Sequence, residues 1–196
     1  MNNKGAKEGQ AMIISDAEHA AIVEAIQNGR HATRNMAIYM LTYRAGLRIG
    51  TVAGLLLSDV LNADGSLKTI VVARRSIMKG SKGSRLYLNN DELRESLEKY
   101  VLERPKSARV ENLFVSQKGG AFTPNGLSKL MLKVYAKAGL EGYSSHSGRR
   151  SFATDVLKSG ADIVALKTLL NHSNIQTTSR YVTHNDDYLM KVVGNI

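Results

Sequence analysis

The stretch NHSNIQTTSRYV, from Asn171 to Val182, places His172 nine residues before Tyr181. An imidazole can take up or release a proton near neutral pH, and a phenol becomes a nucleophile once a base accepts its proton. Both residues also have an ordinary alternative, a histidine at a helix end and an aromatic ring in a core. The pair indicates nucleophilic chemistry only if other residues of the chain can serve the same reaction.

Two further stretches carry cationic side chains where an anion could bind. In AGLRIG, Arg48 stands between apolar residues, and a guanidinium buried there must be paired or bind an anion. In MKGSKGSRL, Lys79 and Lys82 lie on a predicted glycine-rich hairpin, from which a lysine could enter a DNA groove or protonate a leaving group. The alternatives are a surface arginine at a helix start and a solvated turn.

The stretch SSHSGRRSFAT carries His146, Arg149 and Arg150 at a predicted helix start. A spacing of three puts His146 and Arg149 on one helix face, whereas Arg150 should point elsewhere. The positive end of the helix dipole, joined to these side chains, favours an anion such as phosphate. A solvated cationic helix start is the alternative.

Read in chain order, these motifs resemble those of the tyrosine recombinase (phage integrase) family. AGLR is similar to its first arginine box, HSGRRSFAT resembles its His-x-x-Arg box, and LLNHSNIQTTSRY resembles its box with the nucleophilic tyrosine. The resemblance extends from Ile14 to about Val193. It implies a catalytic set that consists of Arg48, Lys79, His146, Arg149, His172 and Tyr181.

The sequence departs from the family pattern at positions next to the matching residues. Thr51 stands where Glu or Asp is usual three residues after the first arginine, and Asn171 replaces the usual glycine before the histidine. Gly148 and Arg150 occupy positions where leucine and histidine are common. None of these departures removes a reacting group, but support for Arg48 must come from elsewhere than Thr51.

The resemblance implies transesterification at a DNA phosphodiester. Tyr181 would attack the scissile phosphorus, form a 3′-phosphotyrosyl link and release a 5′-hydroxyl, with Arg48 and Arg149 holding the non-bridging oxygens. His172 would donate a further hydrogen bond to the phosphate. His146 would accept the phenol proton, and Lys79 would protonate the leaving group, with Lys82 as runner-up.

No cofactor is expected for this reaction. One ester replaces another of similar energy, so no ATP is needed, and two arginines and a lysine can take the part of a metal ion. The sequence also lacks a carboxylate cluster that would hold one.

The implied partner is double-stranded DNA, contacted also by Lys82, Arg85 and Arg150. The family relationship further implies a monomer when free, a homotetramer on DNA, and room for accessory DNA-bending proteins. The alternative function is that of a non-catalytic DNA-binding relative, a regulator that kept the fold without the reaction.

Composition agrees with a nucleic-acid partner. The 196 residues include 27 Lys plus Arg against 17 Asp plus Glu, a net charge of +10, which favours a polyanion. A ribosomal or membrane-surface protein could share this balance. No apolar run approaches the roughly 20 residues of a membrane span, the N-terminus has no signal-peptide pattern, and cysteine is absent. A cytoplasmic setting fits these features.

Periodicity predicts a mainly helical domain with a small antiparallel sheet (α+β), and the resemblance implies the catalytic fold shared with type IB topoisomerases. Strands are expected at 69–73 and 85–88. Helices are expected at about 16–27, 31–45, 49–60, 91–103, 124–138, 146–159, 163–170, 175–182 and 187–193.

Domain organisation is expected to be simple. Residues 1–12 should form a flexible lead, and residues 13–196 a single catalytic domain that includes the C-terminal helix. Such a chain is either an excised catalytic domain or a naturally short member similar to the recombinases that invert fimbrial promoters. The initiator-like Met1 and the polar lead favour the second.

Overall fold

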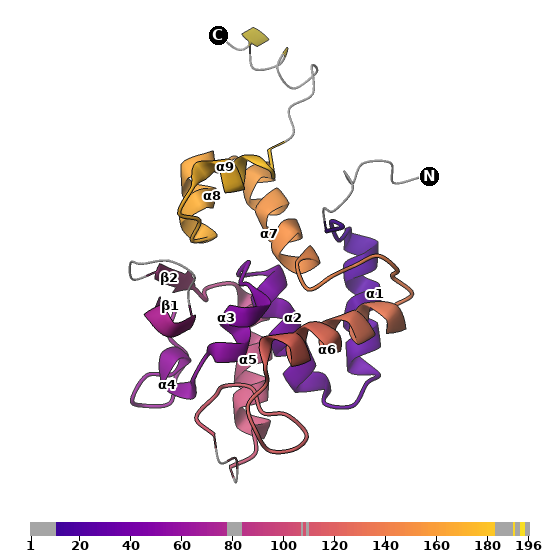
Figure 1. The fold of residues 1–196 in the computed structure, drawn as a ribbon, viewed down its shortest axis with the longest axis vertical. Helices are drawn as coiled ribbons and strands as arrows, with labels where there is room; N and C mark the ends of the chain where they lie inside the picture. The colour runs from indigo at the N-terminus through magenta and orange to yellow at the C-terminus, as the bar shows by residue number, and fades with distance from the viewer. Residues whose placement is uncertain are drawn as a thin grey trace.

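The computed structural model describes residues 11–77, 84–106, 108, 110–182, 190 and 193–194. Helices dominate this part of the chain, and one two-stranded antiparallel sheet lies at its edge (Figure 1), so the predicted mainly α class with a small sheet is confirmed. Residues 1–10 of the predicted lead, the hairpin with Lys79 and Lys82, and most of the predicted C-terminal helix lie outside the described residues. No helix in the described part is both long and apolar enough to cross a membrane.

The elements follow one another in a largely helical order. The helices are α1 (Asp16–Gln27), α2 (Ala32–Tyr43), α3 (Ile49–Gly54), α4 (Leu57–Val60), α5 (Asp91–Glu103), α6 (Pro124–Lys137), α7 (Ser147–Lys158), α8 (Ile163–Leu169) and α9 (Ile175–Ser179). Strand β1 (Ile70–Ala73) is followed by a 3₁₀ turn, η1 (Arg75–Ile77), and pairs with β2 (Ser84–Tyr87), with Val72 opposite Arg85.

Local capping chemistry sets several helix starts where the sequence predicts them. Ser15 and Glu18 form the predicted capping box of α1. Asp162 caps α8 by accepting two backbone N–H groups, and Thr123 caps α6 with Pro124 in its first turn. These caps satisfy N–H groups that would otherwise have no partner at a helix start.

The single helix predicted after Arg48 is wrong, because the chain forms two short helices there. Leu55, between α3 and α4, has extended backbone angles (φ −62°, ψ 137°). Its carbonyl accepts the N–H of Leu113 at 2.7 Å, and Leu56 forms an isolated antiparallel bridge with Asn112. Backbone pairing with a distant loop has therefore replaced continuation of the helix.

Helix α2 forms the centre of the molecule (Figure 1), in contact with α1, α3, α5 and α7. Nine of its residues are buried, from Arg34 and Asn35 through Tyr43, so it has almost no solvent face. A helix that is buried on all sides is a central helix, against which the surrounding helices pack. Through α3 and α7 it positions the segments that carry the two predicted catalytic arginines.

Helix α7 approaches α2 closely at Gly148. A Cβ atom at this position would lie 2.6 Å from Thr42 Oγ1, which donates its own hydrogen bond to Tyr39 O at 2.8 Å. A leucine, common here in the family, would not fit against this threonine. Gly148 thus differs from the usual leucine because α7 crosses α2 closely at this position.

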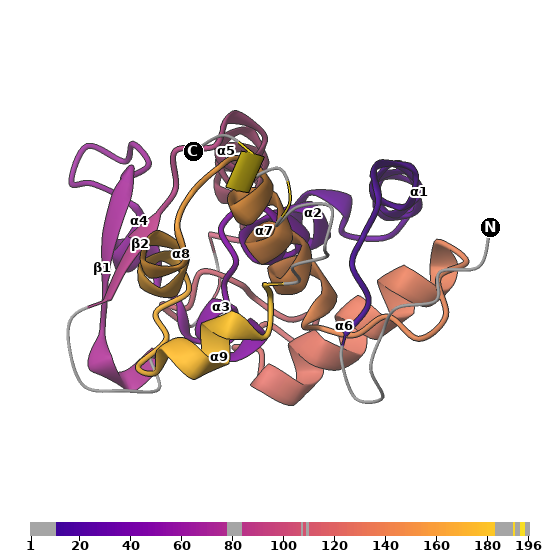
Figure 2. The same cartoon turned by 90° about the horizontal axis from the view of Figure 1, so that it is seen from above.

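Helices α7, α8 and α9 form a second packing unit beside the sheet. Its fully buried apolar residues are Ala153, Leu166 and Leu170, and Phe152 and Tyr181 pack against them. Figure 2 shows α8 next to β2, which agrees with the contact between these elements. This unit carries the second half of the predicted catalytic set.

The helix crossing leads to a stability prediction for Gly148→Ala. A glycine-to-alanine change inside a helix ordinarily stabilises it by about 1 kcal/mol. Here the added methyl group meets Thr42, and overpacking should give a net loss of about 1–3 kcal/mol in denaturant unfolding. Gly120→Ala is the matched control, since nothing lies within 4 Å of its Cβ position. A Gly148→Ala protein as stable as the parent would contradict the close crossing.

Candidate active site

Arg149, in the first turn of α7, is held by two carbonyl groups and one imidazole. It is only 5% exposed. Its Nη1 donates to Gly46 O, and its Nη2 donates to Leu170 O at 2.7 Å and to His172 Nε2 at 2.9 Å. Arginine has five N–H donors, so these bonds leave further donors for a ligand. The contacts orient the guanidinium without neutralising it.

The turn at Gly46 explains one of these contacts. Gly46 has φ +62°, a conformation that favours glycine, and a Cβ there would lie 2.3 Å from the ring of Phe152. The turn presents the Gly46 carbonyl to Arg149 and leads directly into Arg48, the residue that caps the start of α3. The AGLR motif therefore places one arginine and anchors the other.

His172 is 7% exposed and bonded through both ring nitrogens. Its Nε2 pairs with Arg149 and its Nδ1 lies 2.9 Å from Thr178 Oγ1. Because arginine can only donate, Nε2 must be the acceptor, and a neutral ring then carries its proton on Nδ1. In the free protein the ring nitrogen that faces Arg149 therefore accepts a hydrogen bond, and a bond from His172 to phosphate stays a prediction.

Tyr181 follows α9 and faces the same cluster. Its N–H donates to Thr178 O at 3.0 Å, and its ring lies parallel to that of His172, with the ring centres 6.1 Å apart and the planes within 8°. The side chain is partly buried against the small core of α7 and α8. The bend and the short helix between the histidine and the tyrosine thus bring the two rings face to face.

Arg48 is half-buried and belongs to the same electrostatic neighbourhood. Burial lowers the pKa of Arg48, and the Tyr181 phenol acts in the opposite direction. Burial and then Arg48 lower the pKa of Arg149. Among the described residues neither arginine forms an ion pair with a carboxylate. Two cations and a phenol therefore share a site in which the described part of the chain places no paired carboxylate.

His146 has an exposed side chain at the N-cap of α7. Partial desolvation of the ring by the neighbouring protein, followed by the positive charges of Arg149 and Arg48, lowers the pKa of His146. The imidazole is therefore neutral near neutral pH. It lines a hollow of about 300 Å³ together with Arg150 and Tyr181. Arg150 also borders this hollow, and its Nη1 donates to Ala11 O at 2.7 Å, whereas the Arg149 guanidinium turns inward to Gly46 O and Leu170 O.

The remaining predicted residues lie around this cluster or outside the described part. Arg85 is exposed on β2, and its carbonyl lies 3.4 Å from Asn171 Nδ2. Lys79 and Lys82 fall in the undescribed hairpin. Thr51, at the departure from Glu or Asp, donates to Ile77 O at 3.2 Å, in the turn that precedes that hairpin.

The fold explains the departure at Asn171 and adds one contributor, Thr178, that the sequence does not indicate. Asn171 adopts φ +50°, which explains why glycine is usual there and why asparagine is an acceptable replacement. Thr178 is fully buried and contacts His172 from six residues further along the chain. In sequence Thr178 is one of two adjacent threonines, and nothing distinguishes it from Thr177, which is exposed.

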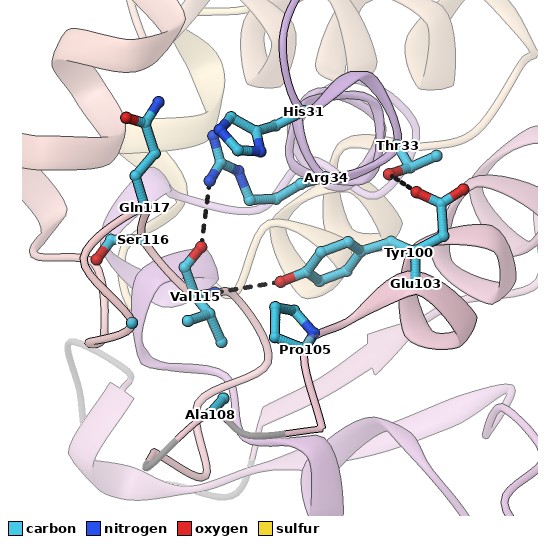
Figure 3. A pocket seen from close by; sticks show the side chains of 11 residues that line it. His31, Thr33, Arg34, Tyr100, Glu103, Pro105, Ala108, Val115, Ser116 and Gln117 are labelled. Carbon is cyan, nitrogen blue, oxygen red and sulfur yellow. Dashed lines mark hydrogen bonds between the residues drawn. The ribbon is translucent and has the colours of Figure 1, made fainter.

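A second hollow, of about 370 Å³, lies between the start of α2, the end of α5 and the loop that follows (Figure 3). Arg34 donates to Val115 O there at 3.2 Å, and the N–H of Val115 donates to Tyr100 Oη at 3.1 Å. None of the predicted catalytic residues lines it. Within the described ranges no three His, Asp or Glu side chains converge to hold a metal ion.

Comparison with known proteins gives consistent matches. Residues 13–187 match the phage integrase family. The tyrosine recombinase XerD of Oceanobacillus iheyensis is 33% identical over 178 residues, 88% of this chain and 57% of that protein. The chain thus spans little more than half the length of the curated relatives that it matches.

Solved structures with the same fold include a recombinase and a transposon integrase. The crystal structure of XerA recombinase has a TM-score of 0.75 at 26% identity, over 95% of this chain and 65% of that one. The Tn1549 transposon integrase, in complex with transposon right end DNA, has a TM-score of 0.80 at 16% identity, over 100% of this chain and 68% of that one. The second likeness concerns the fold alone.

The buried imidazole predicts a pH dependence of stability. Burial, Arg149 and Arg48 lower the pKa of His172 to about 4, below its ordinary value near 6.5. Between pH ~6.5 and pH ~4 the His172 imidazole is protonated in the unfolded chain but neutral in the folded one. The contribution of His172 to the free energy of unfolding is therefore fully present above pH ~6.5 and is lost as the pH falls toward ~4. Between about pH 7 and pH 4, the parent should lose up to ~3 kcal/mol more than His172→Gln in denaturant unfolding. Equal losses would contradict a neutral His172, because the other groups titrate in both proteins.

Proposed function

The chain belongs to the phage integrase family, and we propose that it is a site-specific recombinase that cuts and rejoins double-stranded DNA in the cytoplasm through a 3′-phosphotyrosyl intermediate. The observation that carries this proposal is the pair of half-buried Arg48 and buried Arg149 beside Tyr181, with no carboxylate partner among the described residues. Uncompensated guanidinium groups in a partly dry site stabilise an anion that enters between them.

In the first chemical step the Tyr181 oxygen bonds to the scissile phosphorus and the bond to the 5′-oxygen breaks. The phenol gives up its proton, and the leaving 5′-oxygen gains one. In the second step a 5′-hydroxyl of the partner strand attacks the phosphotyrosine and releases Tyr181. The number of phosphoester bonds stays constant, so neither a nucleotide nor a metal ion enters the scheme as a reactant.

The arginines supply the electrostatic part of catalysis. Negative charge gathers on the non-bridging oxygens in the transition state, and a guanidinium presents paired donors in a rigid plane. Gly46 O and Leu170 O already orient Arg149, so its guanidinium needs little rearrangement when the phosphate binds. Removal of one such donor costs about 10²–10³ in rate in comparable oxyanion sites.

Proton transfer falls to groups at the edge of the cluster. His146 borders the hollow in which Tyr181 lies and is neutral near pH 7, which suits it to accept the phenol proton. Lys79, with Lys82 as the alternative, is proposed as the acid for the 5′-oxygen on grounds of family position. His172 is assigned to the positioning of Arg149. It could donate a hydrogen bond to phosphate through Nε2 only after that nitrogen gains a proton.

Assembly is part of the proposal. Exchange between two duplexes requires four reacting strands, and we infer a homotetramer on DNA, a free monomer and room for DNA-bending proteins. The apolar residues Met190 and Val193 near the C-terminus are 73% and 70% exposed, which supports docking of this region in a neighbouring subunit. A ring of such head-to-tail contacts closes on itself.

The nucleophile is tested by Tyr181→Phe. The variant loses only a hydroxyl, so it should form no covalent adduct with a nicked half-site while its Kd for DNA stays within about twofold. Adduct formation is measured by denaturing gel electrophoresis, and peptide mapping of the parent adduct identifies the attached residue. An adduct that survives in the variant, or that maps to Tyr188, the next tyrosine along the chain, would refute the assignment. DNA binding without an adduct in the parent would favour the non-catalytic regulator.

The leaving-group acid is tested with a substrate whose bridging 5′-oxygen is replaced by sulfur. A thiolate is a far better leaving group than an alkoxide and needs no proton (a thiol pKa is near ~8.5). Lys79→Ala should therefore be slow on the normal substrate and close to the parent rate on the sulfur substrate. Lys82→Ala is the matched control and should weaken DNA binding while reducing the salt slope by about one. Rescue of Lys82→Ala in place of Lys79→Ala would reverse the assignment.

A further inference from the structure

We propose that Thr178 is a positioning residue of the recombinase site: its hydroxyl fixes the tautomer of His172, and through that ring it holds Arg149 in the orientation that receives the phosphate. The inference rests on the proposed function for its catalytic meaning. Three side chains form a chain of hydrogen bonds, from Thr178 to His172 and from His172 to Arg149.

The direction of each hydrogen bond follows from donor chemistry. Arg149 can only donate, so the His172 nitrogen that faces it at 2.9 Å must offer a lone pair. Burial and the two nearby arginines favour the neutral ring, which has one proton to place. That proton lies on Nδ1 and is donated to Thr178 Oγ1 at 2.9 Å.

The opposite tautomer would disrupt the site. With the proton on Nε2, the ring would turn an N–H group toward an N–H group of Arg149, and both donors would lack an acceptor. A buried polar group without its partner costs about 1–3 kcal/mol. Arg149 would relieve this cost only by turning away from His172, and its remaining donors would turn with it. The acceptor at Thr178 is what excludes this arrangement.

The burial of Thr178 makes it the specific acceptor. Its side chain is fully buried, and Oγ1 of Thr178 is the partner that His172 Nδ1 has among the described residues. A water molecule has little access to a ring that is itself 7% exposed. Loss of the hydroxyl should therefore leave Nδ1 without a ready substitute.

Thr178 also holds the nucleophile segment. Its backbone carbonyl accepts the N–H of Tyr181 at 3.0 Å, and the Tyr181 ring stacks on the His172 ring that the Thr178 side chain fixes. One residue thus connects the group that attacks phosphorus with the group that binds the non-bridging oxygens. A shift of α9 that misplaces Tyr181 would also withdraw the acceptor from His172 and release Arg149.

The first test reads the ring in the free protein by imidazole ¹⁵N NMR. In the parent, Nδ1 of His172 should show the shift of a protonated nitrogen and Nε2 that of a lone-pair nitrogen. Thr178→Val, which replaces the hydroxyl by a methyl group, should lose this pattern, and Thr178→Ser should keep it. Thr168→Val is the control, since that exposed hydroxyl donates to Val164 O in α8 and contacts no site residue.

A parent whose His172 carries its proton on Nε2, or a Thr178→Val protein with an unchanged pattern, overturns the proposal. Because this measurement needs no DNA, it decides the structural claim even if the chain proves to cleave no strand. If Thr178→Val does not fold, the Thr178→Ser spectrum and the parent tautomer still decide between the two arrangements.

The second test measures single-turnover adduct formation with a nicked half-site. Thr178→Val should slow cleavage by about 10–100-fold, by analogy with loss of the hydrogen-bond partner that orients a metal-ligating histidine through its second nitrogen. Its Kd for DNA should be unchanged, and Thr178→Ser should recover most of the rate. In a His172→Ala background, Thr178→Val should add little further loss because the two residues act in series.

Additive losses in the double variant would overturn the serial arrangement and leave Thr178 as a simple packing residue. A parent protein that forms no adduct, yet shows the predicted tautomer, would refute the proposed function and not the hydrogen-bond chain. The two tests therefore separate the failure of one claim from the failure of the other.

Discussion

Repulsion between two guanidinium groups is the constraint on which the site depends. Arg48 and Arg149 each lie where burial penalises their charge, the charge of Arg48 further lowers the pKa of Arg149, and the Tyr181 phenol raises the pKa of both. The protein holds Arg149 with neutral acceptors, Gly46 O, Leu170 O and His172 Nε2, where a carboxylate would have cancelled its charge. The site thereby keeps its attraction for an anion. The free-energy cost of desolvating the two guanidinium groups must be offset by the packing around them.

That packing explains several features that look unrelated in sequence. The glycine at 46 allows a left-handed turn against Phe152, and the glycine at 148 allows α7 to approach Thr42 on the central helix. Each brings a backbone segment closer than a side chain would permit. Together they place the start of α7 and the start of α3 in the same region, which is what two arginines separated by about a hundred residues require.

Much of this arrangement could be predicted from the chain alone. Capping residues such as Ser15 and Asp162 mark their helices, and motif order indicates which polar groups belong together. The break between α3 and α4 could not be predicted, because it depends on pairing with residues 111–113. The direction of the His172 bond and the part played by Thr178 also depend on a bend that local patterns do not encode.

The division of the apolar interior into two clusters bears on motion. The main cluster extends from α1 to α6, whereas α7, α8 and the Tyr181 side chain that follows α9 share a separate one whose fully buried members are Ala153, Leu166 and Leu170. Segments held by few buried contacts open at lower free energy than the global unfolding transition. Amide hydrogens of α8 and α9 should accordingly exchange with solvent sooner than those of α2. The tyrosine would thus sit on a local folding unit, free to detach and redock while the scaffold beneath it stays intact.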